Sequence, residues 1–391
     1  MMAKTFITVR QNPRYRQMTL EEFLFEAEAK PQIIINPNMA NTKTYEVESV
    51  SEKFSKYFDI ANLIDKLHVF NRQHEELMLK PREELYHTFY IPKKSGGLRR
   101  IDAPEPELMD ALRSLKTIFE VDFRALYHTS AFAYIKNRST HDAVKKHQKN
   151  RSNWYGKFDL SNFFGNTTPE FVMQMLSMIY PFSEVIKNVS GKDELQKALD
   201  LAFLNGGLPQ GTPISPLITN VMMIPIDFYL TKQLREYENN HFIYTRYADD
   251  FIISSREAFN PKSIKNIIIS TLKKYNAPFS INKAKTRYGS KAGRNWNLGV
   301  MVNADNEITV GWKKKKQFQA MLSSYIMDKL HGKSWDRHDL QVMEGYRNYY
   351  RMIEGETIDN IVSHIAKKFG VDTIQCRNGV NIKMLKEDLR V

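Results

Sequence analysis

The stretch Phe242-Ile243-Tyr244-Thr245-Arg246-Tyr247-Ala248-Asp249-Asp250-Phe251-Ile252-Ile253 sets two adjacent aspartates between two apolar runs. Adjacent acids in isolation are typical of a solvated hairpin turn. The apolar residues on both sides favour two buried strands instead, so that the acids would lie at a packed apex. Because buried carboxylates need a cation nearby, the stretch predicts a β-hairpin with Asp249 and Asp250 at a metal-binding tip.

A third aspartate, Asp159, lies near the end of another apolar run, residues 154–160. Phosphoryl transfer to the end of a nucleic acid uses two divalent cations about 4 Å apart, held by clustered oxygen ligands. Magnesium keeps several waters and takes only a few carboxylates plus substrate phosphates, so three aspartates at strand ends suffice. The sequence therefore predicts a centre for two Mg²⁺ ions, with Mn²⁺ as the candidate substitute.

The charge balance points to a polyanionic partner. Lysine and arginine outnumber the acids 57 to 44, which gives a formal charge of +13. Nucleic acid fits this charge best, although a solvated basic surface would give the same count. The sole cysteine, Cys376, excludes an intrachain disulfide and a cysteine-based zinc site, and indicates a reducing compartment, the cytoplasm. No apolar run is long enough to predict a membrane helix or a signal peptide, so no membrane partner is expected.

Hydrophobic periodicity predicts helices mixed with short strands. Residues 1–85 contain two helical patterns, 19–29 and 51–76. Two β-like runs, 86–92 and 98–104, flank Lys93-Lys94-Ser95-Gly96-Gly97, which predicts a hairpin with a basic tip. Further patterns predict helices from Pro106 and at residues 139–148, 168–180, 216–238 with a break at Pro225, and 261–275, and strands at 154–160, 279–282, 296–302 and 307–310, before a mostly helical end.

Several motifs resemble those of the reverse transcriptase superfamily. The palm of that family carries Tyr-x-Asp-Asp, as in Tyr247-Ala248-Asp249-Asp250, and upstream a strand that ends in aspartate followed by an aromatic. Lys157-Phe158-Asp159-Leu160-Ser161-Asn162-Phe163-Phe164 is similar to the upstream motif. Leu208-Pro209-Gln210-Gly211-Thr212-Pro213-Ile214-Ser215-Pro216 resembles the family's template and nucleotide loop. Motifs in the family's order are far more specific than a single match.

The resemblance implies an α+β protein with a right-hand polymerase fold. It implies an N-terminal helical extension at residues 1–85, fingers at 86–153, a palm with an antiparallel sheet at 154–311, and a helical thumb at 312–391. An insertion belonging to the fingers is expected near residues 165–205 of the palm.

The resemblance also implies roles for the residues of the metal centre. Asp159 and Asp249 would be the main ligands of both metals, Asp250 would assist, and the Leu160 carbonyl would contribute to the nucleotide-side metal. Asn282-Lys283-Ala284-Lys285-Thr286 resembles a late palm motif whose lysine lies near the triphosphate. Lys285 is therefore expected to act with the three aspartates as a catalytic residue, by protonating pyrophosphate.

Two regions would hold the incoming deoxynucleoside triphosphate. Residues 91–104 resemble the fingers hairpin, where Lys94 and Arg99 would clamp the phosphates, although an exposed basic turn would look the same at Lys94. Gln210 and Gly211 belong to the nucleotide loop, and the glycine would let the backbone approach a base pair closely.

The identity of the sugar depends on an aromatic pair. Phe164 falls at the family's steric-gate position, where a ring under the sugar would clash with a 2′-hydroxyl and so favour DNA as the product. The alternative is that Phe164 is an ordinary core aromatic, which is the interpretation we adopt for Phe163.

The primer and template set includes Tyr247, Leu298, Gly299, Lys313 and Lys314. Asn297-Leu298-Gly299 resembles the primer-grip hairpin, although a plain β-turn would look similar. Basic and aromatic residues interleave at residues 346–351, a pattern that suits contact with an RNA/DNA duplex, although rings such as Tyr349 could equally be core.

The resemblance implies an RNA-directed DNA polymerase that makes cDNA. The motif forms and short thumb are similar to bacterial enzymes near retrons and group II introns, and favour a stand-alone enzyme of antiphage defence that copies a cognate structured noncoding RNA. The retron triplet Val-Thr-Gly is replaced here by Trp296-Asn297-Leu298-Gly299. Alternatives are a retron enzyme, a protein-primed or untemplated DNA polymerase of the abortive-infection type, RNA synthesis, and a noncatalytic RNA-binding protein. The sequence leaves oligomerisation open.

Overall fold

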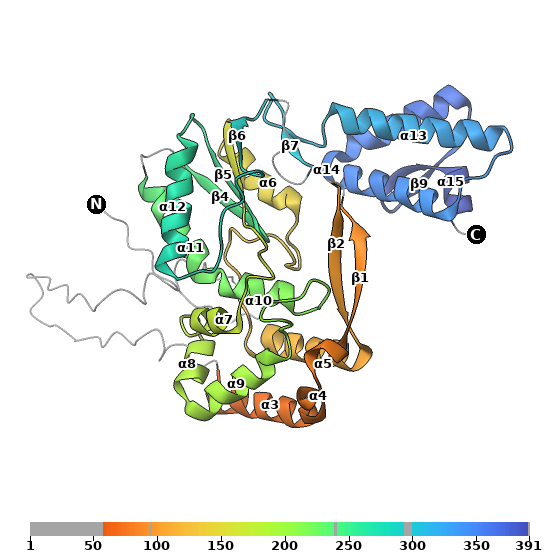
Figure 1. The fold of residues 1–391 in the computed structure, drawn as a ribbon. Helices are drawn as coiled ribbons and strands as arrows, with labels where there is room; N and C mark the ends of the chain where they lie inside the picture. Colours follow the sequence, from red (N-terminus) through yellow and green to blue (C-terminus); the bar gives the residue numbers. More distant parts are fainter. Residues whose placement is uncertain (1–57, 94–95, 238–240, 293–298, 390–391) are drawn as a thin grey trace, which may run out of the picture.

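The computed structural model describes residues 58–93, 96–237, 241–292 and 299–389. Its centre is an antiparallel sheet in the order β4-β5-β3-β6, built from β3 (Trp154–Asp159), β4 (Ile243–Tyr247), β5 (Asp250–Ser255) and β6 (Arg287–Ser290). After its first residue β5 is buried throughout, because sheet neighbours and helices cover it (Figure 1). The mixture of helices with an antiparallel sheet confirms the predicted α+β class.

Helices pack around this sheet. The helix α6 (Thr140–Lys149) contacts β4, and α11 (Ile224–Glu236) contacts both β4 and α12 (Pro261–Lys274). The side chains of Ser139 and Asp142 form a capping box at the start of α6. This box satisfies backbone N–H groups that the first turn of a helix leaves without partners.

The predicted break at Pro225 is confirmed. Helix α10 (Ser215–Met222) ends at Met222 and α11 begins at Ile224. Proline lacks an N–H group, so it is tolerated in the first turn of α11 but not inside a continuous helix.

A long ribbon stands apart from the sheet. Strands β1 (Tyr86–Pro92) and β2 (Leu98–Pro104) pair antiparallel with the predicted bounds, and α5 (Pro106–Thr117) follows as expected (Figure 1). The backbone N–H of Lys93 donates to the Gly97 carbonyl across the tip. Most of the ribbon is exposed, which suits a role in contact with a ligand or another element.

The helices below the ribbon share one core with the sheet. Helix α3 (Ile60–Gln73) packs along α9 (Val189–Asp200). The other elements here are α4 (Glu75–Leu79), the 3-10 turn η1 (Arg82–Leu85), the π-type turn η2 (Ile118–Asp122), α7 (Pro169–Leu176) and α8 (Phe182–Lys187). The predicted helix at residues 19–29 lies outside the described residues.

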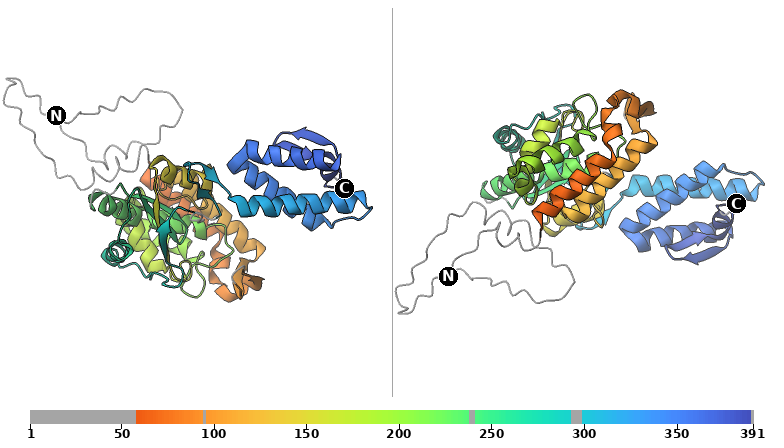
Figure 2. Two further views of the ribbon diagram at one scale, coloured as in Figure 1. Left: turned by 90° about the horizontal axis from the view of Figure 1, so that it is seen from above. Right: turned by 90° about the horizontal axis from the view of Figure 1, so that it is seen from below.

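The C-terminal part builds a second core and projects to one side (Figure 2). It contains α13 (Trp312–Leu330), α14 (Arg337–Phe369) with a kink at Glu354, and α15 (Lys383–Asp388). The hairpin of β9 (Thr373–Cys376) and β10 (Gly379–Ile382) was not predicted. Its strands have four residues each, and β10 is held by contacts with α14 that no local pattern reveals.

The strands predicted after residue 278 differ from those observed. The expected strand at 279–282 is wrong, because it supplies only an isolated bridge between Ile281 and Leu160. The edge strand β6 takes the place beside β3 instead. Strand β8 (Ile308–Thr309) is shorter than the predicted run 307–310, and in the described part of the predicted run 296–302 the strand is β7 (Met301–Val302). None of the helices in the described part of the chain is long and apolar enough to span a membrane.

Candidate active site

The hairpin turn brings three aspartates to one end of the sheet. Tyr247 pairs with Asp250, which leaves Ala248 and Asp249 as a two-residue turn, and Ala248 has a φ of 55°. A positive φ at the first central residue is typical of the II′ turns that fit the twist of paired strands. Asp159 is the register partner of Asp250, and the Leu160 N–H donates to the Asp249 carbonyl at 3.0 Å.

Two lysines neutralise these acids. Lys285 Nζ lies 2.9 and 3.1 Å from the two carboxylate oxygens of Asp159, whose side chain is buried. Lys157 Nζ lies 2.6 Å from Oδ2 of Asp250. Sequence reasoning missed this role of Lys157, although its position two residues before Asp159 on β3 puts both on one face of the sheet.

The donor set suits a hard cation. Oδ1 of Asp250 is buried and has no hydrogen-bond partner, so a carboxylate oxygen remains for a ligand. In the described residues, no three acidic, histidine or cysteine side chains converge at metal-binding distance. Lys285 and Lys157 hold Asp159 and Asp250 in ion pairs. A cation that competes with the ammonium groups would find oxygen ligands of the kind that Mg²⁺ prefers.

The raised pKa values of two of these acids also favour a cation-binding site. Burial raises the pKa of Asp249 to about 6, and the nearby charges of Asp250 and Asp159 add to that rise. Burial also raises the pKa of Asp250, against the opposing effect of Lys157. Bringing like charges together in a partly buried place disfavours their ionised forms, and a bound cation would favour them again.

Phe164 follows Asp159 in the loop after β3. Its ring is half-buried and meets Phe163 edge-on, with 5.7 Å between ring centroids. Phe163 is buried and packs against Phe279, as expected of a core aromatic. The Phe164 carbonyl accepts from the N–H of Leu208, which joins the Phe164 loop to the predicted nucleotide loop.

The nucleotide loop contacts the ribbon. The carbonyl of Gln210 accepts from the Asp102 N–H at 2.9 Å. Gly211 has a φ of 134°, and a Cβ added there would lie 2.7 Å from the Asp102 carbonyl oxygen. The close approach observed at this glycine is thus to the backbone of β2, whereas the sequence suggested a base pair.

Tyr134, a residue that was not predicted, is close enough to Asp249 and to Arg99 to feel their charges. Partial burial raises the pKa of Tyr134, with smaller upward effects from Tyr247 and Asp249, while Arg99 lowers it. The rings of Tyr134 and Tyr247 have centroids 6.4 Å apart, and Tyr134 is 58% exposed. Arg99 lies exposed on β2. Lys94 lies outside the described residues.

Gly299, Lys313 and Lys314 of the predicted primer set lie where the second core begins. Lys314 Nζ donates to the Gly299 carbonyl at 2.7 Å, and Lys313 is exposed. Leu298 lies outside the described residues. Burial raises the pKa of Tyr247, and Tyr349 of α14 contributes to that rise.

The interleaved segment 346–351 divides between surface and core. Arg347 is 1% exposed and ion-paired with Glu344, so its guanidinium is unsuited to direct contact with a duplex, contrary to the expected surface. Tyr350 is also buried. Tyr346 stays 42% exposed and stacks on Tyr350. A helix shows only part of its circumference to solvent, which the interleaved sequence does not specify.

The chain is similar to known proteins. Residues 91–319 match the family described as reverse transcriptase (RNA-dependent DNA polymerase). The retron Ec83 reverse transcriptase of Escherichia coli is 27% identical over 308 residues, which cover 77% of this chain and 92% of that protein. The retron Ec73 reverse transcriptase of the same species is 29% identical over 240 residues, 60% of this chain and 73% of that protein. Apo telomerase from Candida tropicalis aligns at a TM-score of 0.43 with 14% identity, over 72% of this chain and 58% of that one.

Proposed function

The chain belongs to the reverse transcriptase family and is an RNA-directed DNA polymerase, and from that premise we propose that Asp159, Asp249 and Asp250 hold two Mg²⁺ ions for nucleotidyl transfer. The observation that supports this most is the meeting of the three acids at the ends of β3 and β5, with one buried oxygen of Asp250 left without a partner. The Leu160 carbonyl joins the ligands of the nucleotide-side metal. Mn²⁺ substitutes for Mg²⁺.

Two Mg²⁺ ions held by Asp159, Asp249 and Asp250 would activate the primer hydroxyl and stabilise the leaving pyrophosphate. Lys285 supplies the proton. Its hydrogen bond with Asp159 raises the pKa of the ammonium group, so the group is protonated at neutral pH. Its side chain is 61% exposed, so the ammonium group would be accessible to the pyrophosphate.

The deoxynucleoside triphosphate lies between the ribbon and the sheet. Lys94 and Arg99 bind its phosphates, and Gln210 and Gly211 border the new base pair. Phe164 underlies the sugar and excludes a 2′-hydroxyl. This assignment is supported by the bond from the Asp102 N–H to the Gln210 carbonyl, which holds ribbon and loop together.

An RNA-directed polymerase binds an RNA template, and we assign grip of the RNA/DNA duplex to Tyr247, Leu298, Gly299, Lys313 and Lys314. In this proposal residues 86–153 are the fingers, 154–311 the palm with its insertion at 165–205, and 312–391 the thumb. Residues 1–85 are the N-terminal extension.

The proposed biological role is antiphage defence in the bacterial cytoplasm, with a cognate structured noncoding RNA as template. Similarity to two retron reverse transcriptases supports a dedicated RNA template. A retron role and self-priming on a protein hydroxyl are the competing accounts. Sequencing of nucleic acid that copurifies with the protein tests the cognate RNA template, and a single abundant RNA is expected. Mass spectrometry tests self-priming, since a covalent nucleotide adduct on the protein would show it.

The metal centre is tested by an Asp249→Ala, Asp250→Ala double variant assayed on poly(rA) primed with oligo(dT), with dTTP and Mg²⁺. Incorporation is expected to fall to background while the protein stays folded. The control is Asp110→Ala, an exposed acid on a separate element, α5. Retention of the parent's rate by the double variant would overturn the assignment.

A further inference from the structure

Arg246 lies directly before the catalytic turn and is fully buried. Its side chain and that of Asp227 on α11 have no exposed surface. The guanidinium donates to Asp227 through Nε at 2.9 Å and through Nη2 at 2.8 Å. The Tyr244 hydroxyl donates to the same carboxylate at 2.7 Å, so two side chains from one face of β4 hold the acid.

The remaining nitrogen of Arg246 reaches the turn itself. Nη1 donates to the carbonyl of Ala248 at 3.3 Å and to Oδ1 of Asn220 at 3.2 Å. Asn220 lies on α10, just after the nucleotide loop, and its Nδ2 donates to the carbonyl of Ala133 at 2.7 Å. One guanidinium therefore connects the turn with α10 and α11.

The backbone of Arg246 adds a further connection. Its N–H donates to the Ser130 carbonyl at 2.6 Å and its carbonyl accepts from the Phe132 N–H at 2.9 Å. These bonds make a parallel bridge between Arg246 and the segment that carries Tyr134, the aromatic beside Asp249. Turn and segment thus share the same anchor.

Stability alone is a weak explanation for this pair. Apolar residues of similar volume often replace a buried ion pair without loss of stability, because desolvation offsets the attraction between the charges. A planar guanidinium with five donors can instead fix several acceptors at set angles, which an ammonium group cannot do.

We propose that Arg246 is a positioning residue that fixes the Tyr247-Ala248-Asp249-Asp250 turn relative to Asn220 and the Tyr134 segment, with Asp227 as its orienting partner. The inference rests on the proposed carboxylate site. Arg246 touches no substrate in this account, and it acts by keeping Asp249 and Asp250 at the separation from Asp159 that two cations require.

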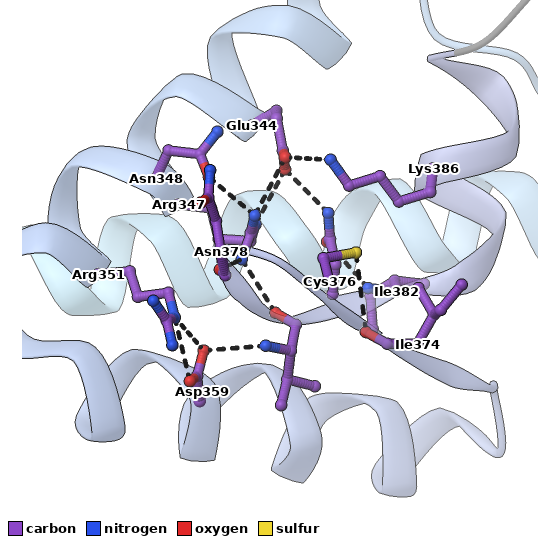
Figure 3. A network of polar contacts seen from close by, with 12 residues as sticks. Glu344, Arg347, Asn348, Arg351, Asp359, Ile374, Cys376, Asn378, Ile382 and Lys386 are labelled. Atoms are coloured by element: carbon purple, nitrogen blue, oxygen red, sulfur yellow. Dashed lines mark hydrogen bonds and ion pairs between the residues drawn. The ribbon is translucent and has the colours of Figure 1, made fainter.

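The chain offers a matched control for an Arg246→Lys variant. Arg347 is also buried, pairs with the acid Glu344, and donates through Nη1 to the carbonyls of Asn378 and Val380 (Figure 3). Arg347→Lys therefore removes the same kind of network from the second core. The difference between the two variants isolates the position beside the turn.

The measurements are kcat on poly(rA) with oligo(dT) and dTTP, the Mg²⁺ concentration for half-maximal rate, and the melting temperature. For Arg246→Lys we expect kcat to fall on the order of 100-fold, the effect of a small misplacement of reacting groups, and the Mg²⁺ requirement to rise. For Arg347→Lys we expect a lower melting temperature with both kinetic values close to those of the parent. A role in folding alone would not move the Mg²⁺ requirement.

Parent-like Mg²⁺ dependence of Arg246→Lys, or an equal change in Arg347→Lys, overturns the proposal. If Arg246→Lys fails to fold, Tyr244→Phe decides, because it removes only the hydroxyl that orients Asp227. It is expected to raise the Mg²⁺ requirement in the same direction, and an unchanged value overturns the proposal. Activity surviving in the Asp249→Ala, Asp250→Ala variant would instead show that the carboxylate site itself is wrongly assigned.

Discussion

Asp159 and Asp250 are cross-strand partners, so the last residue of β3 faces the first residue of β5. A different lysine neutralises each of them, Lys285 on one side and Lys157 on the other. The two lysines differ in exposure, at 61% for Lys285 and 23% for Lys157. The more exposed lysine is the one free to move during a reaction, and the more buried one is suited to holding its acid in place.

Replacement of Lys285 by glutamine is expected to lower kcat on the order of 100-fold, because a positioned general acid contributes about that much. The KM for dTTP should change little. The comparison is Lys283→Gln, an exposed lysine two residues earlier, which should behave as the parent. Equal rates for the two variants in single-turnover kinetics would rule out a general acid at Lys285.

Replacement of Phe164 by alanine is expected to raise incorporation of ribonucleotides relative to deoxynucleotides, because the ring under the sugar is lost. The ratio of kcat/KM for UTP and dTTP measures this. Phe163→Leu is the control, since that buried ring packs on Phe279 and its change should affect the melting temperature without affecting sugar selection. The same ratio in Phe164→Ala and parent would contradict a steric gate.

Replacement of Gly211 by alanine is expected to disturb the junction of the nucleotide loop and β2. The new Cβ would meet the Asp102 carbonyl at 2.7 Å, and the φ of 134° is strained for any L side chain. A cost of about 1–3 kcal/mol is typical of such strain, and the KM for dTTP should rise. Gly206 has a φ of 76° with open space around it, so Gly206→Ala tests strain without the clash. A similar KM in both variants would argue against the junction.

Acid should destabilise the protein through His147. Its ring is buried between the hydroxyls of Ser254 and Thr245, and burial lowers its pKa from 6.5 to about 3. The unfolded state then binds more protons between these values, so this contribution to stability is complete above pH 6.5 and is lost as the pH falls toward 3. Loss should reach about 2 kcal/mol near pH 5.

Urea denaturation at a series of pH values, compared between the parent and His147→Gln, measures that loss. The difference between the two curves removes the opposite contribution of Asp249, whose raised pKa makes the folded state bind protons more tightly. A difference that does not change with pH would show that His147 titrates normally.

Local patterns predicted the elements that local chemistry determines. The ribbon was predicted with the correct bounds because two β runs flank a glycine-rich turn. Helix α6 was predicted because Ser139 and Asp142 cap its first turn. The three aspartates were predicted as a group, and the structure places them at one end of the sheet. Their roles as ligands stay predictions.

Contacts between distant parts of the chain could not be predicted from local patterns. The segment 279–282 looked like a strand, but the neighbour of β3 is β6, because edge pairing depends on tertiary packing rather than on β-propensity. Arg246 was part of the quoted motif, yet its acid lies 19 residues earlier on a helix. Arg347 shows the same limit, since its burial follows from the unpredicted β9–β10 hairpin.

The bond between the Asp102 N–H and the Gln210 carbonyl has a mechanical consequence. The residues of the ribbon β1–β2 that we propose bind the triphosphate lie toward its tip, and this bond lies near its base. A tilt of the tip on nucleotide arrival would therefore be transmitted to the loop that borders the templating base. Substrate capture and template alignment would then be one coupled movement rather than two independent steps.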